Sequence, residues 1–200
     1  MIMKMKTFLM ALVAAAAWSL IAAENFASKS RWIWYEASQI TAGDCYYRLT
    51  VDFKDRVESL ELITYLDDSG HCFLNGKRIG GVWTARGEKV VIKAQKFELT
   101  KDLKPGKNVL AFKVHNVRGA GGMIVLGRII YASGKAEYIH SNKDWKASAV
   151  LENNWNTADF DDSNWKAAKE FFDVNAEPWA KMSKVQTVCR TPEEQAQTAK

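Results

Sequence analysis

Between residues 62 and 117, short runs of alternating apolar and polar residues are separated by closely spaced turn signals, and this pattern constrains the fold most strongly. The turn signals are Asp67-Asp68, Asn75-Gly76 and Pro105-Gly106, residue types that favour tight reversals of the backbone. An apolar-polar period of two is typical of a strand with one buried face. Many short strands joined by such turns indicate an all-β sandwich or barrel.

The period of two continues outside this segment. One face of the run from residue 45 to 53 carries Cys45, Tyr47, Leu49, Val51 and Phe53. Further strand candidates are 60–66, 90–92, 97–99, 109–114, 123–131 and 137–140. No window has the i, i+3, i+4, i+7 spacing of a long amphipathic helix. The sequence therefore predicts a two-sheet antiparallel sandwich, with a short helical turn that Asp162 or Ser163 caps and that runs through Ala168.

The first 23 residues are typical of a secretory signal peptide. Lys4 and Lys6 precede an apolar run that ends in small residues at Ala23. A membrane anchor is the alternative, but a spanning helix usually needs about 20 apolar residues. We therefore expect cleavage near Ala23, a secreted or periplasmic protein without a stable membrane span, one domain over residues 24–180, and a polar flexible tail over residues 181–200.

Charge and composition exclude several kinds of function. The net charge of +5 falls to about +3 without Lys4 and Lys6, and the basic residues are scattered, whereas nucleic-acid binding needs a concentrated basic surface. The histidines, His71, His115 and His140, lack metal-binding spacing, and no nucleotide or nucleophile motif occurs. We therefore expect no metal, no cofactor and no nucleic-acid partner.

The cysteines leave their pairing open. Cys45, Cys72 and Cys189 are an odd number, so at least one thiol is free or paired between molecules. A disulfide between Cys45 and Cys72 requires neighbouring strands, and two separately buried thiols are the alternative.

The Asn75-Gly76 turn predicts the register of one hairpin. A two-residue Asn-Gly turn favours type I′ geometry. Leu74 then faces Lys77, Cys72 faces Ile79, His71 faces Gly80 and Asp68 comes near Trp83, provided that the hairpin has no bulge. Asp67, Asp68, His71 and Trp83 would gather at the end opposite the turn.

This group of side chains has the chemistry of a sugar site. Carboxylates accept hydrogen bonds from hydroxyl groups, and an exposed indole covers the apolar face of a pyranose. Asp67 and Asp68 could instead simply end a strand, with Trp83 packed under a loop. Arg118, beside the glycine-rich connection 119–122, is a further candidate ligand contact at the rim.

A series of motifs extends over residues 31–179. They are Trp32-Ile33-Trp34, Tyr46-Tyr47-Arg48, Leu66-Asp67-Asp68, Leu74-Asn75-Gly76-Lys77, Leu103-Lys104-Pro105-Gly106-Lys107-Asn108-Val109, Gly121-Gly122, Asp144-Trp145-Lys146, Phe160-Asp161-Asp162-Ser163-Asn164-Trp165 and Pro178-Trp179. In this order they resemble the galactose-binding-like jelly-roll domains, above all the accessory domains of bacterial α-L-rhamnosidases and the sugar-binding domain of family 2 glycoside hydrolases. The resemblance implies a jelly-roll sandwich that contacts carbohydrate and is often attached to a larger hydrolase.

The resemblance does not extend to catalysis. Rhamnosidases carry their catalytic carboxylates on a separate helical barrel, and none of the motifs above belongs to it. Asp67 and Asp68 make a poor catalytic pair, because neighbours in a strand point to opposite faces while glycosidase carboxylates face each other across a cleft. Most of the eight tryptophans are expected in the core, or pinning a C-terminal wrap onto the sandwich.

Three functions remain open from the sequence. The first is a non-catalytic carbohydrate-binding module, not an enzyme, with Asp67, Asp68, His71, Trp83 and Arg118 at the ligand. The second is an assembly subunit that docks on a larger glycoside hydrolase or an envelope complex. The third and weakest is a small glycoside hydrolase.

Overall fold

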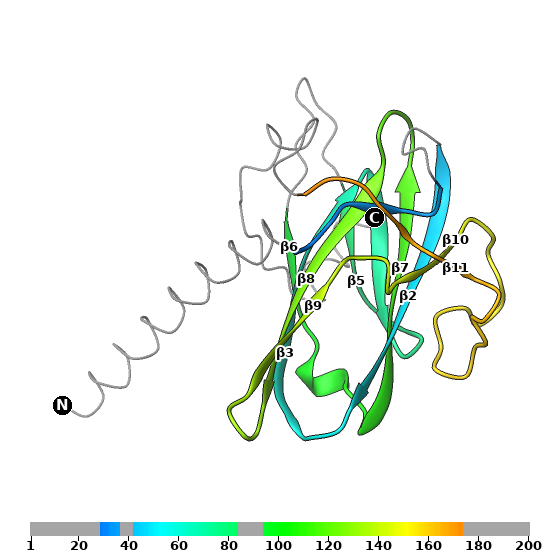
Figure 1. Ribbon diagram of the computed structural model, residues 1–200. Helices are drawn as coiled ribbons and strands as arrows, with labels where there is room; N and C mark the ends of the chain where they lie inside the picture. The colour runs from blue at the N-terminus through cyan, green and yellow to red at the C-terminus, as the bar shows by residue number, and fades with distance from the viewer. Residues whose placement is uncertain (1–28, 37–41, 84–93, 174–200) are drawn as a thin grey trace.

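Two antiparallel sheets form the fold of the chain in a computed structural model, which describes residues 29–36, 42–83 and 94–173. Figure 1 shows the two sheets packed against each other, with sheet A on the left and sheet B on the right. The described part of the chain contains no α-helix, only a 3-10 turn, η1, at Thr100–Asp102. The predicted all-β, two-sheet jelly-roll sandwich is confirmed.

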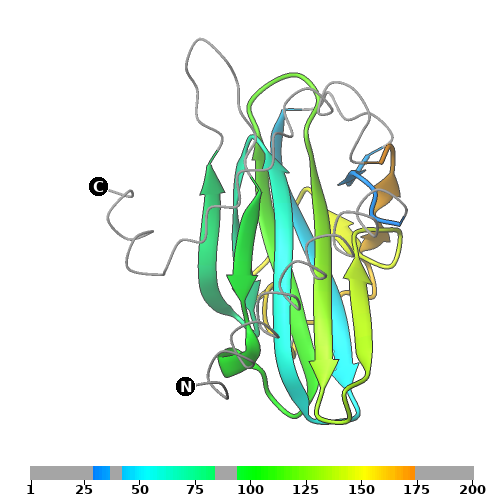
Figure 2. The same cartoon turned by 90° about the vertical axis from the view of Figure 1, so that its left-hand side faces the viewer.

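Sheet A has the strand order β12-β1-β8-β3-β6, and β9 pairs with β8 beside β1. Its strands are β1 (Ile33–Trp34), β3 (Val57–Asp67), β6 (Gln95–Glu98), β8 (Gly122–Tyr131), β9 (Ala136–His140) and β12 (Lys169–Glu170). Figure 2 looks onto this sheet, where the long strands β3 and β8 run side by side.

Sheet B has the strand order β11-β10-β2-β7-β4-β5. Its strands are β2 (Gly43–Phe53), β4 (Ser69–Leu74), β5 (Lys77–Trp83), β7 (Gly106–Asn116), β10 (Lys146–Ser148) and β11 (Lys166–Ala167). The connection from β7 to β8 lies at the end of the sandwich opposite the β4–β5 turn (Figure 1).

The main core fills the space between the two sheets. Side chains alternate along β2, so one face of this strand is directed into the core. Cys45, Tyr47 and Phe53 are buried in this core, while Tyr46 and Arg48 belong to the outer face of sheet B. The face predicted for residues 45–53 is therefore confirmed. The same core contains Leu110 and Phe112 of the neighbouring strand β7, and Leu62 and Leu66 of β3 in the facing sheet A.

The β4–β5 hairpin has the predicted turn but not the predicted register. Asn75 and Gly76 have positive φ angles of 50° and 86°, as a type I′ turn requires, and Leu74 pairs with Lys77. A register shift between Cys72 and Phe73 then pairs Cys72 with Gly80, His71 with Gly81 and Ser69 with Trp83. The expected pairs Cys72–Ile79 and His71–Gly80 are wrong, because an extra residue in one strand displaces every later pair.

Residues 149–165, here called the wrap, cover part of the outer face of sheet B (Figure 1). Trp155 and Trp165 pack there with Tyr46, Val109 and Ala111 of the sheet. Their rings stack with centroids 6.2 Å apart. The predicted tryptophan-rich wrap is therefore present.

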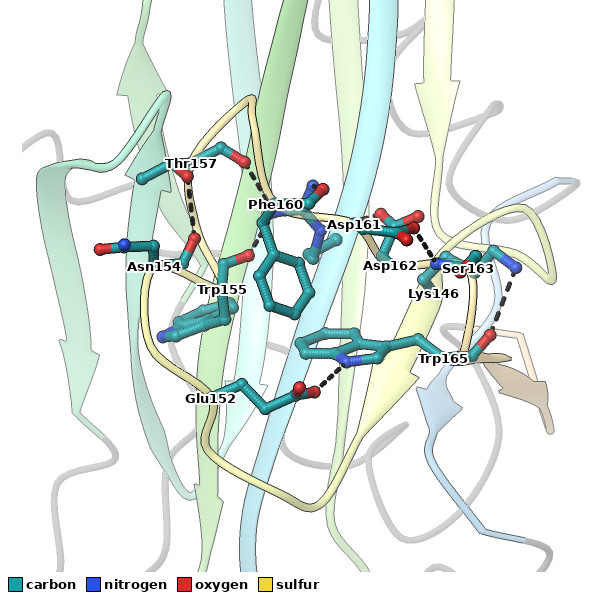
Figure 3. Close-up of polar contacts among 11 residues, drawn as sticks. Lys146, Glu152, Asn154, Trp155, Thr157, Phe160, Asp161, Asp162, Ser163 and Trp165 are labelled. Carbon is teal, nitrogen blue, oxygen red and sulfur yellow. Dashed lines mark hydrogen bonds and ion pairs between the residues drawn. The ribbon is translucent and has the colours of Figure 1, made fainter.

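Arg48 of β2 anchors the wrap, and only 1% of its side chain is exposed. Its Nε donates to Asp162 Oδ2 at 2.8 Å, and its Nη1 donates to the carbonyl oxygens of Trp155 and Thr157. Its guanidinium carbon also lies 5.0 Å from the centre of the Phe160 ring. Figure 3 shows Asp162, Trp155, Thr157 and Phe160 converging on this point, and the Trp165 indole donating to Glu152.

Three further expectations are corrected or completed. The helical turn expected through Ala168 is replaced by a turn in which Trp165 N donates to Asp162 O, followed by the strands β11 and β12, because the backbone here pairs with β10 and β1. Cys45 and Cys72 are separate, buried free thiols, and burial raises the pKa of both. The strand candidate 90–92, Cys189, the signal peptide 1–23 and the tail 181–200 lie outside the described residues.

Candidate functional site

Two rows of polar side chains cross the outer face of sheet B beyond the edge of the wrap. Paired residues of an antiparallel sheet project to the same face, so register partners on successive strands form a row. The first row contains Asp44 of β2, His115 of β7 and Ser69 of β4. The second row contains Tyr46, Lys113 and His71 of the same three strands.

These rows line a hollow of about 310 Å³, formed by Asp44, Ser69, Gly70, His71, Lys113 and His115. Ligand pockets commonly occupy about 300–1,000 Å³, so this hollow suits one small ring better than a long chain. Larger hollows of about 450 and 480 Å³ lie at the β2–β3 turn and beside the wrap. Their polar groups already serve local structure: Lys54 pairs with Asp52, and Glu152 holds Trp165.

Asp44 is the electrostatic centre of the hollow. Its Oδ1 lies 2.7 Å from His115 Nδ1, and its Oδ2 lies 2.8 Å from Lys113 Nζ. Burial alone would raise the pKa of Asp44, but the hydrogen bonds and charges of Lys113 and His115 outweigh it and lower the pKa. Asp44 is therefore a carboxylate that can only accept, so His115 Nδ1 carries the hydrogen that they share.

Lys113 and His71 line the hollow with Asp44, and the two side chains differ in charge at neutral pH. The hydrogen bond to Asp44 is the main reason why the pKa of Lys113 is raised, so its ammonium group is charged at neutral pH. Burial, and then the positive charge of Arg78, lower the pKa of His71. A neutral imidazole has one donor and one acceptor nitrogen, which suits the hydroxyl groups of a sugar.

The structure separates the other predicted site residues. Asp67 is buried at the end of β3, where it pairs with Gly122 of sheet A. Asp68 joins the two sheets, and its Oδ2 accepts a hydrogen bond from Val117 N at 2.7 Å. Arg118 is exposed in the β7–β8 connection. Of the four predicted residues whose side chains the structure describes, only His71 lines the hollow.

Trp83 lies next to the hollow in the backbone register, because it pairs with Ser69. Its side chain lies outside the described part of the structure. The five tryptophans whose side chains are described, Trp32, Trp34, Trp145, Trp155 and Trp165, are all buried. None of these five rings therefore offers an exposed stacking surface. Trp32 and Trp34 belong to different apolar clusters.

The row Asp44–His115–Ser69 resembles the residue set of an acyl-transfer triad, but its setting lacks a second requirement. Such chemistry needs backbone N–H groups directed at a developing oxyanion. Ser69 belongs to β4, which pairs with β7 on one side and β5 on the other, so its ladder N–H groups are engaged. The geometry of the hollow therefore fits binding better than acyl transfer.

Neither a metal centre nor a membrane span is found within residues 29–36, 42–83 and 94–173. No three His, Cys, Asp or Glu side chains there are grouped to hold a metal ion. No helix in the same residues has the length and hydropathy to cross a bilayer.

The two antiparallel sheets give the chain the fold of a jelly-roll sandwich, similar to the galactose-binding-like domains. No protein-family model matches the sequence. The sequence is 26% identical over 162 residues to an α-L-rhamnosidase of Streptomyces avermitilis, a match that covers 78% of this chain and 16% of that enzyme. The chain thus spans only a small part of the curated relative.

Solved structures give the same result. The structure of the Streptomyces avermitilis α-L-rhamnosidase with L-rhamnose has a TM-score of 0.66 at 26% identity, and the match covers 76% of this chain and 15% of that one. The apo lectin of Pleurotus ostreatus has a TM-score of 0.70 at 21% identity, covering 80% and 46%. An α-L-rhamnosidase from Dictyoglumus thermophilum has a TM-score of 0.66 at 17% identity, covering 84% and 23%. The resemblance stated from the sequence motifs is confirmed.

Sequence reasoning missed four of the residues that line the hollow with side chains: Asp44, Ser69, Lys113 and His115. His115 and Lys113 follow the alternation of β7, and Asp44 precedes the apolar face of β2, so each was visible as a polar strand residue. Their meeting depends on the strand order β2-β7-β4, which periodicity does not reveal.

Proposed function

We propose that this protein is a non-catalytic carbohydrate-binding module whose sugar lies in the hollow on the outer face of sheet B. The observation that carries the proposal is the cluster of Asp44, Lys113, His115, His71 and Ser69, which concentrates donors and acceptors on a rigid sheet. The likeness of the fold to a fungal lectin, solved elsewhere with N-acetylgalactosamine, supports the same class of ligand.

The chemistry of the hollow suits hydroxyl groups. Asp44 holds Lys113 and His115 in place through charge-assisted contacts, and His71 and Ser69 beside them can both donate hydrogen bonds to a sugar and accept them. Each contact replaces one with water, so its net contribution is only about 1 kcal/mol. Binding at a single site is therefore expected to be weak, and repeated sites or a partner protein would raise the effective affinity.

Isothermal titration calorimetry on glycans chosen from an array tests the proposal. His71→Ala should weaken binding about fivefold, because it removes one side chain of the hollow that contributes about 1 kcal/mol. His140→Ala is the matched control, because His140 is a half-buried histidine of sheet A, away from the hollow. Trp83→Ala tests whether Trp83, which pairs with Ser69 in the backbone register, contributes to sugar binding. Absence of binding to every glycan, or unchanged affinity in His71→Ala, would refute the site.

Docking on a larger glycoside hydrolase is a second candidate, because the wrap exposes two large aliphatic side chains. Val150 is 65% exposed and Leu151 is 63% exposed, next to each other in the chain. The Streptomyces enzyme, of which the chain matches 16%, shows that this fold occurs within a larger hydrolase. Co-purification of a stoichiometric hydrolase, lost in Val150→Asp/Leu151→Asp, together with silent glycan arrays would favour docking over sugar binding.

Export through a signal peptide over residues 1–23 stays a prediction. It agrees with an extracellular glycan as ligand. N-terminal sequencing of the protein recovered outside the cytoplasm tests it, and an intact Met1 there would contradict it.

A further inference from the structure

The hollow offers a ligand more hydrogen-bond donors than acceptors among its charged groups. The carboxylate of Asp44 already accepts from His115, from Lys113 and, at 3.3 Å, from the Tyr46 hydroxyl. A carboxylate has about four acceptor positions, so little of this capacity remains for a ligand. The main role of Asp44 is therefore to hold the neighbouring donors in place, and it accepts few hydrogen bonds from sugar hydroxyl groups.

Lys113 keeps unused donor capacity beside Asp44. An ammonium group has three N–H donors, and the contacts with Asp44 and Tyr46 use two at most. The Lys113 side chain is 37% exposed, so a ligand in the hollow can reach its nitrogen. The hydroxyl of Ser69, in the neighbouring row, adds another donor.

The positive charge of Arg78, which is outside the lining of the hollow, acts on His71 within it. Arg78 pairs with Phe73, and its charge is close enough to lower the pKa of His71, after burial. Among the described side chains that line the hollow, Lys113 and Asp44 carry opposite charges, so the donors that remain unused decide what the hollow can bind. A donor-rich hollow favours a ligand that carries an anionic oxygen group.

We infer that the hollow selects saccharides that carry an acidic group, a carboxylate or a sulfate, and that Lys113 binds this group. The inference rests on the proposed function and narrows its ligand class. The sugar ring lies across His71 and Ser69, and the anionic oxygens lie at Lys113, with Arg78 adding long-range attraction. A neutral sugar binds in the same place but leaves the spare donor of Lys113 to water.

Calorimetry on the full chain tests this selectivity with four probes: trigalacturonate, its methyl ester, a sulfated galactose trisaccharide and neutral galactotriose. One charge-assisted contact corresponds to about tenfold in affinity, so at least one acidic probe should bind about tenfold more tightly than its neutral counterpart. The two acidic probes distinguish a carboxylate from a sulfate. The preference should shrink as sodium chloride is added, because salt screens exposed charges.

Variants assign the preference to Lys113. Lys113→Gln should weaken the binding of the acidic probe about tenfold more than that of its neutral counterpart, so that the ratio of the two affinities falls to about one. Lys77→Gln is the matched control, because Lys77 pairs with Asp102 at the opposite end of the sandwich. If Lys113→Gln fails to fold, Arg78→Gln, at an exposed position, should reduce the preference in part.

The outcomes separate this inference from the proposed function. Equal affinity for acidic and neutral probes, with binding weakened in His71→Ala, overturns the inference and supports the carbohydrate module. An acidic preference that survives in Lys113→Gln overturns the role of Lys113. No binding of any of the four probes, or of any arrayed glycan, overturns both.

Discussion

Replacing Arg48 by methionine should detach the wrap from sheet B. Methionine preserves much of the length of the side chain but removes every donor. The change leaves Asp162 without its partner and the carbonyl oxygens of Trp155, Thr157 and Phe160 without the guanidinium that they share. We expect the free energy of unfolding to fall by an amount typical of a broken buried charge network.

The magnitude follows from the burial of the two partners. Removing one partner of a fully buried ion pair costs about 3–5 kcal/mol. Asp162 is 25% exposed, so water can solvate it again and the cost lies near the lower end. We expect a loss of about 3 kcal/mol, or about 6–12 °C in Tm for a domain of this size. Arg48→Lys should recover only part of it, because an ammonium group lacks the planar fork of donors.

Urea denaturation followed by circular dichroism measures the loss, and hydrogen exchange in the wrap locates it. Arg56→Met is the matched control, because Arg56 pairs with Glu58 through a side chain that is 78% exposed. Such a surface pair contributes about 0–1 kcal/mol. If Arg48→Met costs no more than Arg56→Met, or if exchange in the wrap is unchanged, Arg48 does not anchor the wrap.

Three further predictions concern the turn, the hollow and the thiols. Gly134→Ala should cost about 1 kcal/mol, because it places a side chain at a φ of 82° with open space around it. Gly76→Ala should cost more in the same urea titration, since its added Cβ would lie 3.1 Å from Thr157 Cγ2; equal costs would refute that contact. Burial lowers the pKa of His71, so the unfolded chain binds more protons and stability should fall as the pH drops below 6.5. His71→Gln should flatten this decline in Tm, and an unchanged slope would contradict the burial of the ring. The two buried thiols should resist iodoacetamide in the native protein and react in urea, as mass spectrometry of the labelled peptides can show, and rapid native labelling would be inconsistent with their burial.

Local patterns in the sequence predicted the parts of the fold that depend on neighbouring residues. The alternation from Cys45 to Phe53 and the Asn75-Gly76 turn are set by side-chain period and backbone conformation, so both appear as expected. The shift between Cys72 and Phe73 escaped prediction, because a bulge depends on packing against a neighbouring strand.

The hollow was harder to predict because its members are distant in sequence. Asp44 and His115 are 71 residues apart and meet only because β2 pairs with β7. The buried state of Arg48 had the same cause: the alternation of β2 placed it on the polar face, and only the returning wrap covers that face. The alternation of residues alone therefore does not reveal that Arg48 is buried and holds the wrap on sheet B.

The burial of Trp155 and Trp165 determines what the fluorescence of these two indole rings can report. Indole fluorescence shifts to longer wavelengths when water reaches the ring, and Trp155 and Trp165 are enclosed between the wrap and sheet B. A red shift would therefore signal that the wrap has lifted. Trp155 also packs edge-on against Tyr46 and Phe73 beside the hollow, so a ligand titration that is followed by fluorescence has to be checked by calorimetry.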